Sequence, residues 1–421
     1  MSKRILSLLI ALVMVVGVAV MATSCKTGDS NNGAGTGNTN DEGAGTGDEV
    51  AIPADFKLGV ILLHDEDSTY DLNFINGVLA AKAALGLSDS QVIMKRNIPE
   101  SNDCYEAALD LVDEGCDVIF ANSFNHESHL LKAAKETPEV EFCHATGTMA
   151  HTEKLDNFHN AFASIYEGRY LAGVAAGMKL NAMIKAGTIT AEQAKMGYVG
   201  AFTYAEVISG YTSFYLGAKS VCPSVTMDVQ FTGSWYDETA EKNAANALIA
   251  NNCVLISQHA DSMGAPSACE EKGIPNVSYN GSTAEHCPNT FIVSSRIDWA
   301  PSFKYICETA AKGEKIAADW TGTIATGSVV LTDVNEKAAA PGTVEKIAEV
   351  QAMLEKGDLH VFDIETFTVD GKKLESSAAN VDFDEKYTPD TEVIADGYFR
   401  ESECRSAPYF GLDIDGIEVP N

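Results

Sequence analysis

The fold can be predicted from the stretch KLGVILLHDEDSTYDLNFINGVLAAKAAL (57–85), which joins a strand-like run to a helix-like run. Residues 57–63 are almost all apolar, as expected of a short strand buried on both faces. Residues 70–85 carry apolar side chains at helical spacing, namely Phe74, Val78, Ala81 and Leu85. A second apolar run, QVIMKRN (91–97), follows. A strand, a helix and a second strand at this spacing are typical of a parallel βαβ unit.

The same alternation continues along the chain and then restarts. In the first set, further strands are expected at 117–123 and 141–147, and helices at 102–114 and 129–136. After a small-residue helix at 168–180, a second set is expected, with strands at 196–202, 227–233, 253–259, 274–280 and 290–295 and helices at 207–221 and 239–251. Each set is large enough for an open, doubly wound sheet, and such sheets bind ligands beyond the carboxyl ends of their strands. Two facing sheets would therefore enclose a cleft between them.

The N-terminal segment predicts export. Lys3 and Arg4 precede an apolar run from Ile5 to about Met21, and small residues lead to Cys25. This pattern describes a secretory signal at 1–24. It also resembles the lipobox of bacterial lipoproteins, which ends on a lipidated Cys, and in this chain that residue is Cys25. A single transmembrane anchor is the alternative, since the run is just long enough to span a bilayer. We expect a lipid-anchored, extracytoplasmic protein with a disordered tether at 25–54, rich in Gly, Asn, Thr and Asp.

Charge and cysteine content exclude several classes of site. The chain carries 60 acidic and 29 basic residues, a net charge of −31, which argues against nucleic acid as a partner because phosphate binding needs clustered Lys and Arg. Apart from Cys25, nine Cys are present, without a CxxC pair or zinc-like His and Cys spacing. We therefore expect no metal, and mostly free buried thiols with at most one disulfide.

No enzyme motif stands out. The chain lacks a GxSxG elbow, a P-loop, an HExxH pair and a GxGxxG turn opening a helix after a strand. His259, Asp261 and Ser262 are close in sequence, but neighbours at this spacing rarely give the geometry of a hydrolytic triad. The sequence therefore predicts no catalytic residue and no cofactor.

Polar and aromatic residues recur where the predicted strands end. The aromatic candidates for a ligand-binding site are Tyr70, Phe124, Phe202 and Trp235. The polar candidates are Asp71, Asp261 and Asn280. Aromatic faces would hold a flat ring, since stacking on a base contributes roughly 1–3 kcal/mol, and carboxylates and amides would pair with ring nitrogens or sugar hydroxyls. Without Lys or Arg, such a site suits an uncharged, donor-rich ligand.

Several long blocks resemble the basic membrane protein family, the PnrA-like purine-nucleoside-binding lipoproteins of ABC importers. The matching blocks are NFHNAFASIYEGRYLAGVAAG (157–177), GYVGAFTYAEVISGYTSFYLGAKSV (197–221), GSWYDETAEKNAANALI (233–249), QHADS (258–262) and HVFDIETFTVDGK (360–372). The resemblance implies a type I periplasmic-binding-protein fold with two Rossmann-like lobes and three hinge crossings. Its boundaries would be 55–163 plus about 290–325 for lobe 1, 164–289 plus about 326–375 for lobe 2, and 376–421 for an irregular C-terminal segment.

The resemblance also implies a ligand and a partner. The ligand would be a purine nucleoside or purine base closed between the lobes, and the partner an ABC permease. Carried onto this chain, it assigns Tyr70 as the stacking aromatic, Asp71 in place of the usual Asn, and Trp235 and Asp237 in a TWYD block. It also assigns His259 and Asp261, which lie in a block of the QHxDS type, and Asn280, which matches the family's GYN sequence, as ligand-binding residues.

Two departures from the family's pattern leave the ligand open. Gly281 and Ser282 stand where this branch has Ser-Asp, and a Lys after the next strand is absent, with Ser295 and Arg296 nearby. Another small polar ligand is therefore an alternative. So is an exported sensor or adhesin that uses the same fold without transport.

Overall fold

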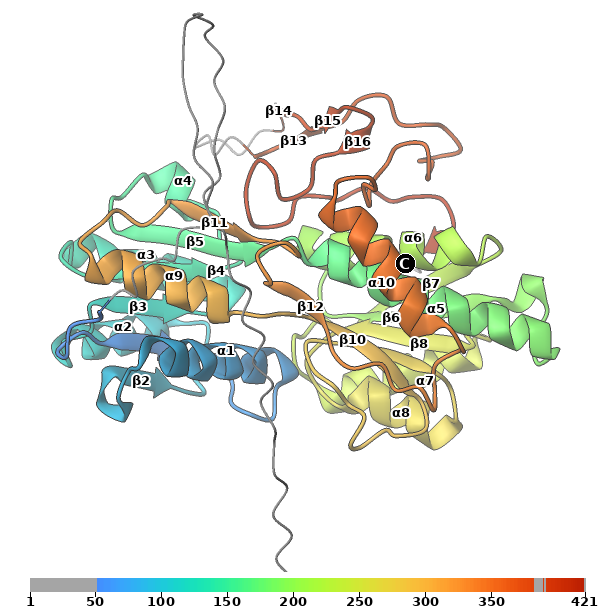
Figure 1. The fold of residues 1–421 in the computed structure, drawn as a ribbon, viewed down its shortest axis with the longest axis horizontal. Helices are drawn as coiled ribbons and strands as arrows, with labels where there is room; N and C mark the ends of the chain where they lie inside the picture. Colours follow the sequence, from blue (N-terminus) through green and yellow to red (C-terminus); the bar gives the residue numbers. More distant parts are fainter. Residues whose placement is uncertain (1–50, 382–388, 390, 420–421) are drawn as a thin grey trace, which may run out of the picture. The chain divides into compact units, whose positions relative to one another are not determined.

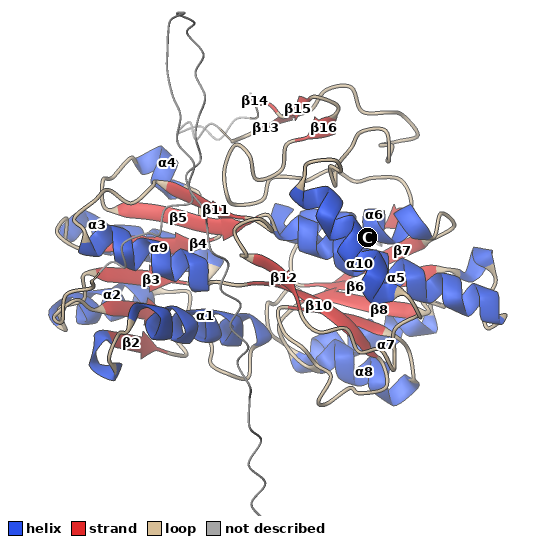
Figure 2. Ribbon diagram, in the orientation of Figure 1, coloured by secondary structure: helices blue, strands red, loops and turns tan. Residues whose placement is uncertain are grey.

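The computed structural model describes residues 51–381, 389 and 391–419. The expected signal at 1–24, the expected lipidation site Cys25 and most of the expected tether lie outside these residues. Within them, no helix is long and apolar enough to cross a membrane. The described elements form two large sheets, each with helices on both faces (Figures 1 and 2), and two small sheets of two strands each.

The first sheet contains six parallel strands in the order β2-β1-β3-β4-β5-β11. They are β1 (Leu58–Ile61), β2 (Val92–Lys95), β3 (Val118–Ala121), β4 (Glu141–Ala145), β5 (Phe158–Ala163) and β11 (Asp319–Gly322). Its main helices are α1 (Thr69–Leu85), α2 (Asn102–Asp113), α3 (Glu127–Glu136), α4 (Met149–Glu153) and α9 (Ala300–Ala311). α1 and α9 pack together, as do α2 and α3.

Alternation along the strands explains why both faces of this sheet are covered. In β1, Val60 packs in the cluster that contains Phe74 of α1 and Phe303 of α9. The next residue, Ile61, packs with Ala108 of α2 instead. A strand apolar on both sides needs a helix on each face, and the run at 57–63 predicted this arrangement.

The second sheet repeats the strand order of the first: β7-β6-β8-β9-β10-β12, with β17 added beside β7. Its strands are β6 (Lys195–Gly200), β7 (Thr226–Phe231), β8 (Leu255–His259), β9 (Asn276–Tyr279), β10 (Phe291–Ile297), β12 (Val329–Leu331) and β17 (Ile417–Glu418). All pair in parallel except β10 and β12. The prediction of two tandem βαβ sets is confirmed.

The helices of the second sheet are α5 (Ile165–Ala186), α6 (Ala205–Val221), α7 (Glu238–Ala250), α8 (Gly264–Lys272) and α10 (Thr343–Glu355). α5 lies against α6 at very short range. A Cβ placed on Gly173 would collide with the carbonyl oxygen of Phe214, and one on Gly217 with that of Tyr170. The small residues of these helices therefore set how closely their backbones approach.

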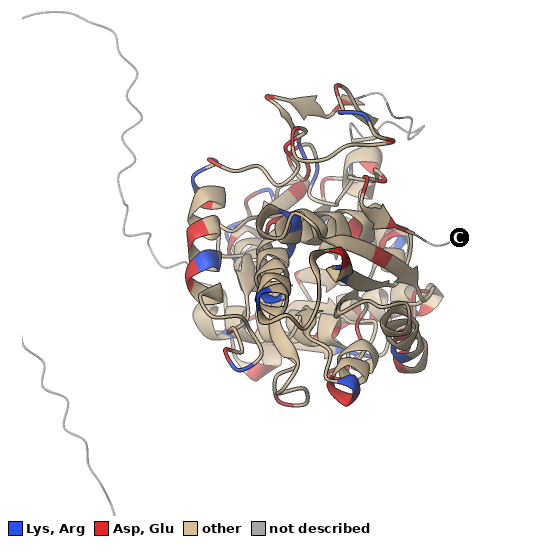
Figure 3. Ribbon diagram, turned by 90° about the vertical axis from the view of Figure 1, so that its right-hand side faces the viewer, with Lys and Arg blue, Asp and Glu red and all other residues tan. Residues whose placement is uncertain are grey.

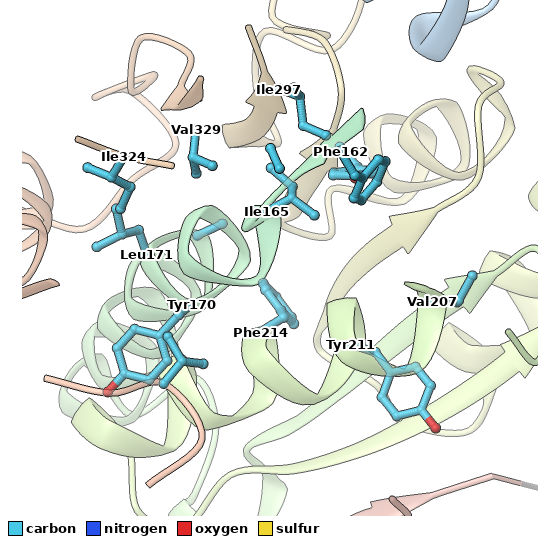
Figure 4. Packing of buried hydrophobic residues seen from close by; sticks show 14 of the residues in the cluster. Phe162, Ile165, Tyr170, Leu171, Val207, Tyr211, Phe214, Ile297, Ile324 and Val329 are labelled. Atoms are coloured by element: carbon cyan, nitrogen blue, oxygen red, sulfur yellow. The ribbon is translucent and has the colours of Figure 1, made fainter. Parts of the chain in front are cut away.

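The chain crosses between the sheets three times. β5 leads to α5, β10 leads to α9, and β11 leads to β12. Apolar residues of these crossings pack together, as Figure 4 shows for Phe162, Ile165, Ile297 and Val329. The second crossing departs from the predicted boundary: residues from about 290 were assigned to the first lobe, but β10 pairs with β9 and the chain leaves the second sheet only after Ile297.

The C-terminal segment contacts elements of both sheets. The amide of Ser406 donates to Asp319 Oδ2 of β11 at 2.7 Å, while β17 pairs with β7. The remaining short elements are β13 (Ala378–Ala379), β14 (Thr391–Glu392), β15 (Ile394–Ala395), β16 (Tyr398–Phe399) and the 3-10 turns η1 (Asp89–Gln91), η2 (Phe124–His126) and η3 (Ala191–Gln193). The segment is mostly irregular, as predicted.

Cysteines and charges agree with the expectations. All nine Cys of the described residues are free, and eight of them are buried, whereas Cys404 is exposed. Acidic and basic residues are interspersed along the described elements (Figure 3).

Candidate functional site

A cavity of about 340 Å³ lies where the carboxyl ends of the two sheets meet. Its lining residues all follow or end strands. Those from the first sheet are Leu63 and Tyr70 after β1, Ser123 and Phe124 after β3, and Thr146 after β4. Those from the second are Glu206 after β6, Trp235 after β7, His259 and Asp261 at the end of β8, and Tyr279 and Asn280 at the end of β9. This is the position at which doubly wound sheets bind ligands.

Six of the nine predicted ligand-binding residues line this cavity: Tyr70, Phe124, Trp235, His259, Asp261 and Asn280. They come from loops far apart in sequence, and the fold brings them together. The other three predicted residues, Asp71, Phe202 and Asp237, do not line it. Each has a structural position of its own.

Asp71 supports the cavity from behind its wall. Its Oδ1 accepts hydrogen bonds from the amide of His64 at 3.1 Å and from Asn122 Nδ2 at 2.8 Å. Only 1% of Asp71 is exposed. The carboxylate therefore ties the loop after β1 to the end of β3, which holds Tyr70 and Phe124 in place.

Phe202 belongs to an aromatic group beside the cavity. Its ring stacks on Tyr204 at 5.1 Å between centroids and meets Trp235 edge-on at the same distance. Edge-to-face and offset-stacked pairs at this range are favourable. Phe202 therefore orients Trp235, which does line the cavity.

Asp237 is the N-cap of α7. Its Oδ1 accepts the amide of Ala240 at 2.9 Å, which satisfies one of the free N–H groups of the first helical turn. The residues of the WYD sequence at 235–237 therefore have different roles, since Trp235 lines the cavity and Asp237 caps the start of α7.

Five further residues line the cavity that were not predicted from the sequence: Leu63, Ser123, Thr146, Glu206 and Tyr279. Glu206 is the most consequential of them because it is charged. It lies in the first turn of α6, where an acidic residue is common for its effect on the helix dipole. Only its burial, with 8% of the residue exposed, sets it apart.

Several groups lining the cavity are buried without a partner in the protein. Asn280 Nδ2 and both ring nitrogens of His259 have none, although these residues are 3% and 2% exposed. Asn280 also has a positive φ of 65°, a conformation that Asn tolerates better than most residues. Buried polar groups normally find partners, so these atoms are positioned for a bound molecule.

The electrostatics of the cavity are unusual. Burial, followed by the nearby carboxylates of Glu241, Asp71 and Glu206, raises the pKa of Asp261 well above its ordinary value. Burial lowers the pKa of His259, which favours the neutral imidazole. His259 Nε2 lies 3.4 Å from Glu206 Oε1.

Neighbouring groups hold two aromatic side chains of the cavity wall in place. Tyr70 is fixed by its hydroxyl, which donates to the carbonyl of Asn122 at 2.7 Å. Tyr279 packs against His259 at 4.4 Å between ring centroids. Among the described residues, no group of three His, Cys, Asp or Glu side chains could hold a metal ion.

Contacts across the cavity join the two sides. The amide and the hydroxyl of Thr69 both donate to the carbonyl of Asp261, at 3.0 and 3.1 Å. His64, after β1, meets Tyr236, after β7, with ring centroids 5.4 Å apart. These pairs bring loops of the two sheets into direct contact.

The family comparison identifies proteins that this chain resembles. The family described as "ABC transporter substrate-binding protein PnrA-like" matches residues 64–357. The purine-binding protein BAB2_0673 of Brucella abortus is 31% identical over 271 residues, which cover 63% of this chain and 71% of that protein. The putative ABC transporter glucose-binding protein TsgA13 of Haloferax volcanii is 31% identical over 217 residues, about half of each chain.

Solved structures support the fold. A solute-binding protein of an ABC transporter from Aeropyrum pernix matches with a TM-score of 0.61 at 17% identity, covering 73% of this chain and 93% of that one. Another from Conexibacter woesei matches with a TM-score of 0.59 at 18% identity, covering 72% and 98%. The predicted type I periplasmic-binding-protein fold is confirmed.

Proposed function

The chain belongs to the PnrA-like family of ABC transporter substrate-binding proteins, which work on the extracytoplasmic side of the membrane, and we propose that it binds a purine nucleoside or purine base. The bound molecule would be passed intact to the permease of an importer. The observation that carries this proposal is the cavity between the two sheets, where aromatic rings and buried, unpartnered polar atoms face the same space.

The cavity has the chemistry of a base-binding site. Tyr70, Phe124 and Trp235 provide ring faces, and stacking of a base on an aromatic side chain contributes roughly 1–3 kcal/mol. Asn280 and His259 offer polar atoms that have no partner in the protein.

The relatives support two ligand classes. The Brucella abortus protein is named as purine-binding, and the Haloferax volcanii protein, at the same identity, as glucose-binding. A sugar is therefore the second candidate ligand. We favour the purine because it uses both the ring faces and the polar atoms of the cavity.

Delivery to the permease would depend on closure of the two sheets around the ligand. A ligand that contacts both walls stabilises the closed arrangement over the open one. Lipidation at Cys25 would keep the protein at the membrane surface near its permease.

Thermal-shift screening of the purified full chain against purine nucleosides, purine bases, sugars and amino acids tests this proposal. A ligand that binds the folded state raises the unfolding midpoint by mass action. We expect a rise with purine compounds, and recovery of the compound chemically unchanged. A rise with sugars alone would exclude the purine, and turnover of the compound would exclude a pure binding function.

A further inference from the structure

The cavity carries two buried carboxylates. Glu206 and Asp261 both line it, and they are 8% and 5% exposed. They come from different strand ends of the second sheet, after β6 and at β8. Among the described residues that line the cavity, none is Lys or Arg. The wall therefore holds no cation that could neutralise Glu206.

The groups around the cavity leave Glu206 without a cationic partner. Glu241 lies behind Asp261, and its carboxylate accepts the amides of Asp237 and Ser262. The buried Arg169 is engaged elsewhere, since it donates to Ser257 Oγ at 2.7 Å and to Tyr198 Oη at 3.1 Å. Neither of those groups is a carboxylate, so the charge of Arg169 is not paired with Glu206.

Glu206 has little to satisfy it within the protein. Its contact with His259 Nε2 at 3.4 Å does not satisfy that nitrogen, which has no hydrogen-bond partner. Asn280 Nδ2 is a buried donor without a partner in the same cavity. The carboxylate of Glu206 and the amide of Asn280 thus remain for a bound molecule, and buried polar groups left unpaired are costly.

Purines differ in what they present to such a wall. The pairing edge of guanine carries an acceptor oxygen followed by two adjacent N–H donors. The corresponding edge of adenine carries one amino group followed by an acceptor nitrogen. Ionised carboxylates only accept hydrogen bonds, so the adenine nitrogen would face an acceptor, whereas both guanine donors find one.

On these grounds we propose that Glu206 determines specificity, selecting purines whose pairing edge has two adjacent N–H groups over purines of the adenine type. This inference rests on the proposed purine-binding function. Asn280 would donate to the ring oxygen, and Glu206 would accept from the two N–H groups. A site built to pair a polar group discriminates strongly against an analogue that leaves the group unpaired.

Calorimetric titration of the full chain with guanosine, inosine and adenosine tests the inference, because the three nucleosides share the same ribose. We expect guanosine to bind at least about tenfold more tightly than adenosine, with inosine between them, since it lacks the second donor. In Glu206→Gln, which replaces one acceptor by a donor, the ratio of guanosine to adenosine affinity should fall to about threefold or less.

Glu238→Gln is the matched control, because Glu238 is exposed in the first turn of α7 and does not line the cavity. It should keep the wild-type ratio, and the unfolding midpoints should show that both variants fold. Equal binding of guanosine and adenosine to the wild type, or an unchanged ratio in Glu206→Gln, would overturn the role of Glu206 while leaving purine binding intact. Failure of the three nucleosides, and also of the free bases guanine, hypoxanthine and adenine, to bind would overturn both.

Discussion

The rings of Phe124 and Tyr204 stack with their centroids 5.0 Å apart and their planes 22° from parallel. Phe124 follows β3 of the first sheet, and Tyr204 precedes α6 of the second. Phe124 lines the cavity and is also 37% exposed, so this pair lies where the cavity reaches the surface. The contact joins loops of the two sheets, so the proposed opening of the cleft would break it.

Tyr204→Ala should speed ligand release. An aromatic pair contributes about 0.5–1.5 kcal/mol beyond its buried area, which corresponds to a dissociation rate roughly two- to tenfold higher. Stopped-flow displacement of bound nucleoside measures this rate. Tyr105→Ala is the control, because Tyr105 lies on α2 and pairs with Glu136 of α3 within the first sheet's own helices. Equal release rates in the two variants would show that the contact between Phe124 and Tyr204 does not slow ligand release.

Trp235→Ala and Asp261→Ala should each weaken nucleoside binding at least about tenfold, a cost of at least about 1.4 kcal/mol. Trp235 provides a ring face and Asp261 a buried carboxylate in the same cavity. Equilibrium titration gives the affinity, and far-ultraviolet circular dichroism shows whether the variants fold. Unchanged affinity in both folded variants would place the ligand elsewhere.

Asp237→Ala should affect stability rather than binding. The side chain caps α7 by accepting the amide of Ala240, and loss of such a cap costs about 1 kcal/mol. Urea unfolding should report this loss, while the nucleoside affinity remains at the wild-type value. A large loss of nucleoside affinity with unchanged stability would show instead that Asp237 takes part in ligand binding.

Glu401 should make stability depend on pH. Burial raises its pKa to about 7, from an ordinary value of 4.5, although it accepts the amides of Tyr409 and Phe410. Between these two pH values the folded state keeps a proton that the unfolded state has lost, so this contribution to stability falls as the pH rises from 4.5 to 7 and is constant above. Over this window the free energy of unfolding of the wild type should fall by up to about 3 kcal/mol relative to that of Glu401→Gln.

Urea unfolding of both proteins at several pH values between 4.5 and 8 measures this difference. Glu403→Gln provides the comparison, because Glu403 is an exposed acidic residue of the same segment. It should follow the wild type at every pH. A difference between wild type and Glu401→Gln that does not change with pH would contradict the raised pKa.

Local patterns predicted most of the βαβ elements. The helix predicted at 70–85 is observed as Thr69–Leu85, because Ser68 caps its start and Gly86, with φ of 67°, ends it. The strand β5 was missed since its sequence FHNAFA contains polar residues. In the fold these side chains find partners: Asn160 Nδ2 donates to Glu127 at 2.9 Å, and His159 Nδ1 lies 3.1 Å from the carbonyl oxygen of Ala317.

The site was predictable where a residue follows a strand and is chemically distinctive, as with Tyr70, Trp235 and Asp261. It was not predictable where only tertiary burial separates a lining residue from an ordinary one. From its sequence context Glu206 looks like an ordinary acidic residue at the start of a helix, yet it lines the cavity. Asp237 looks like a ligand-binding residue of its motif, yet it caps α7. Their positions follow from how the loops pack, which local sequence does not encode.

The most direct test of the binding site is a crystal structure of the protein with the purine nucleoside that binds best in the screen. We expect the base to lie in the cavity between the two sheets, in contact with Tyr70 from the first and with Trp235 and Asp261 from the second. A nucleoside bound on one sheet alone, or a cavity filled by the protein's own side chains while the nucleoside lies elsewhere, would contradict the account.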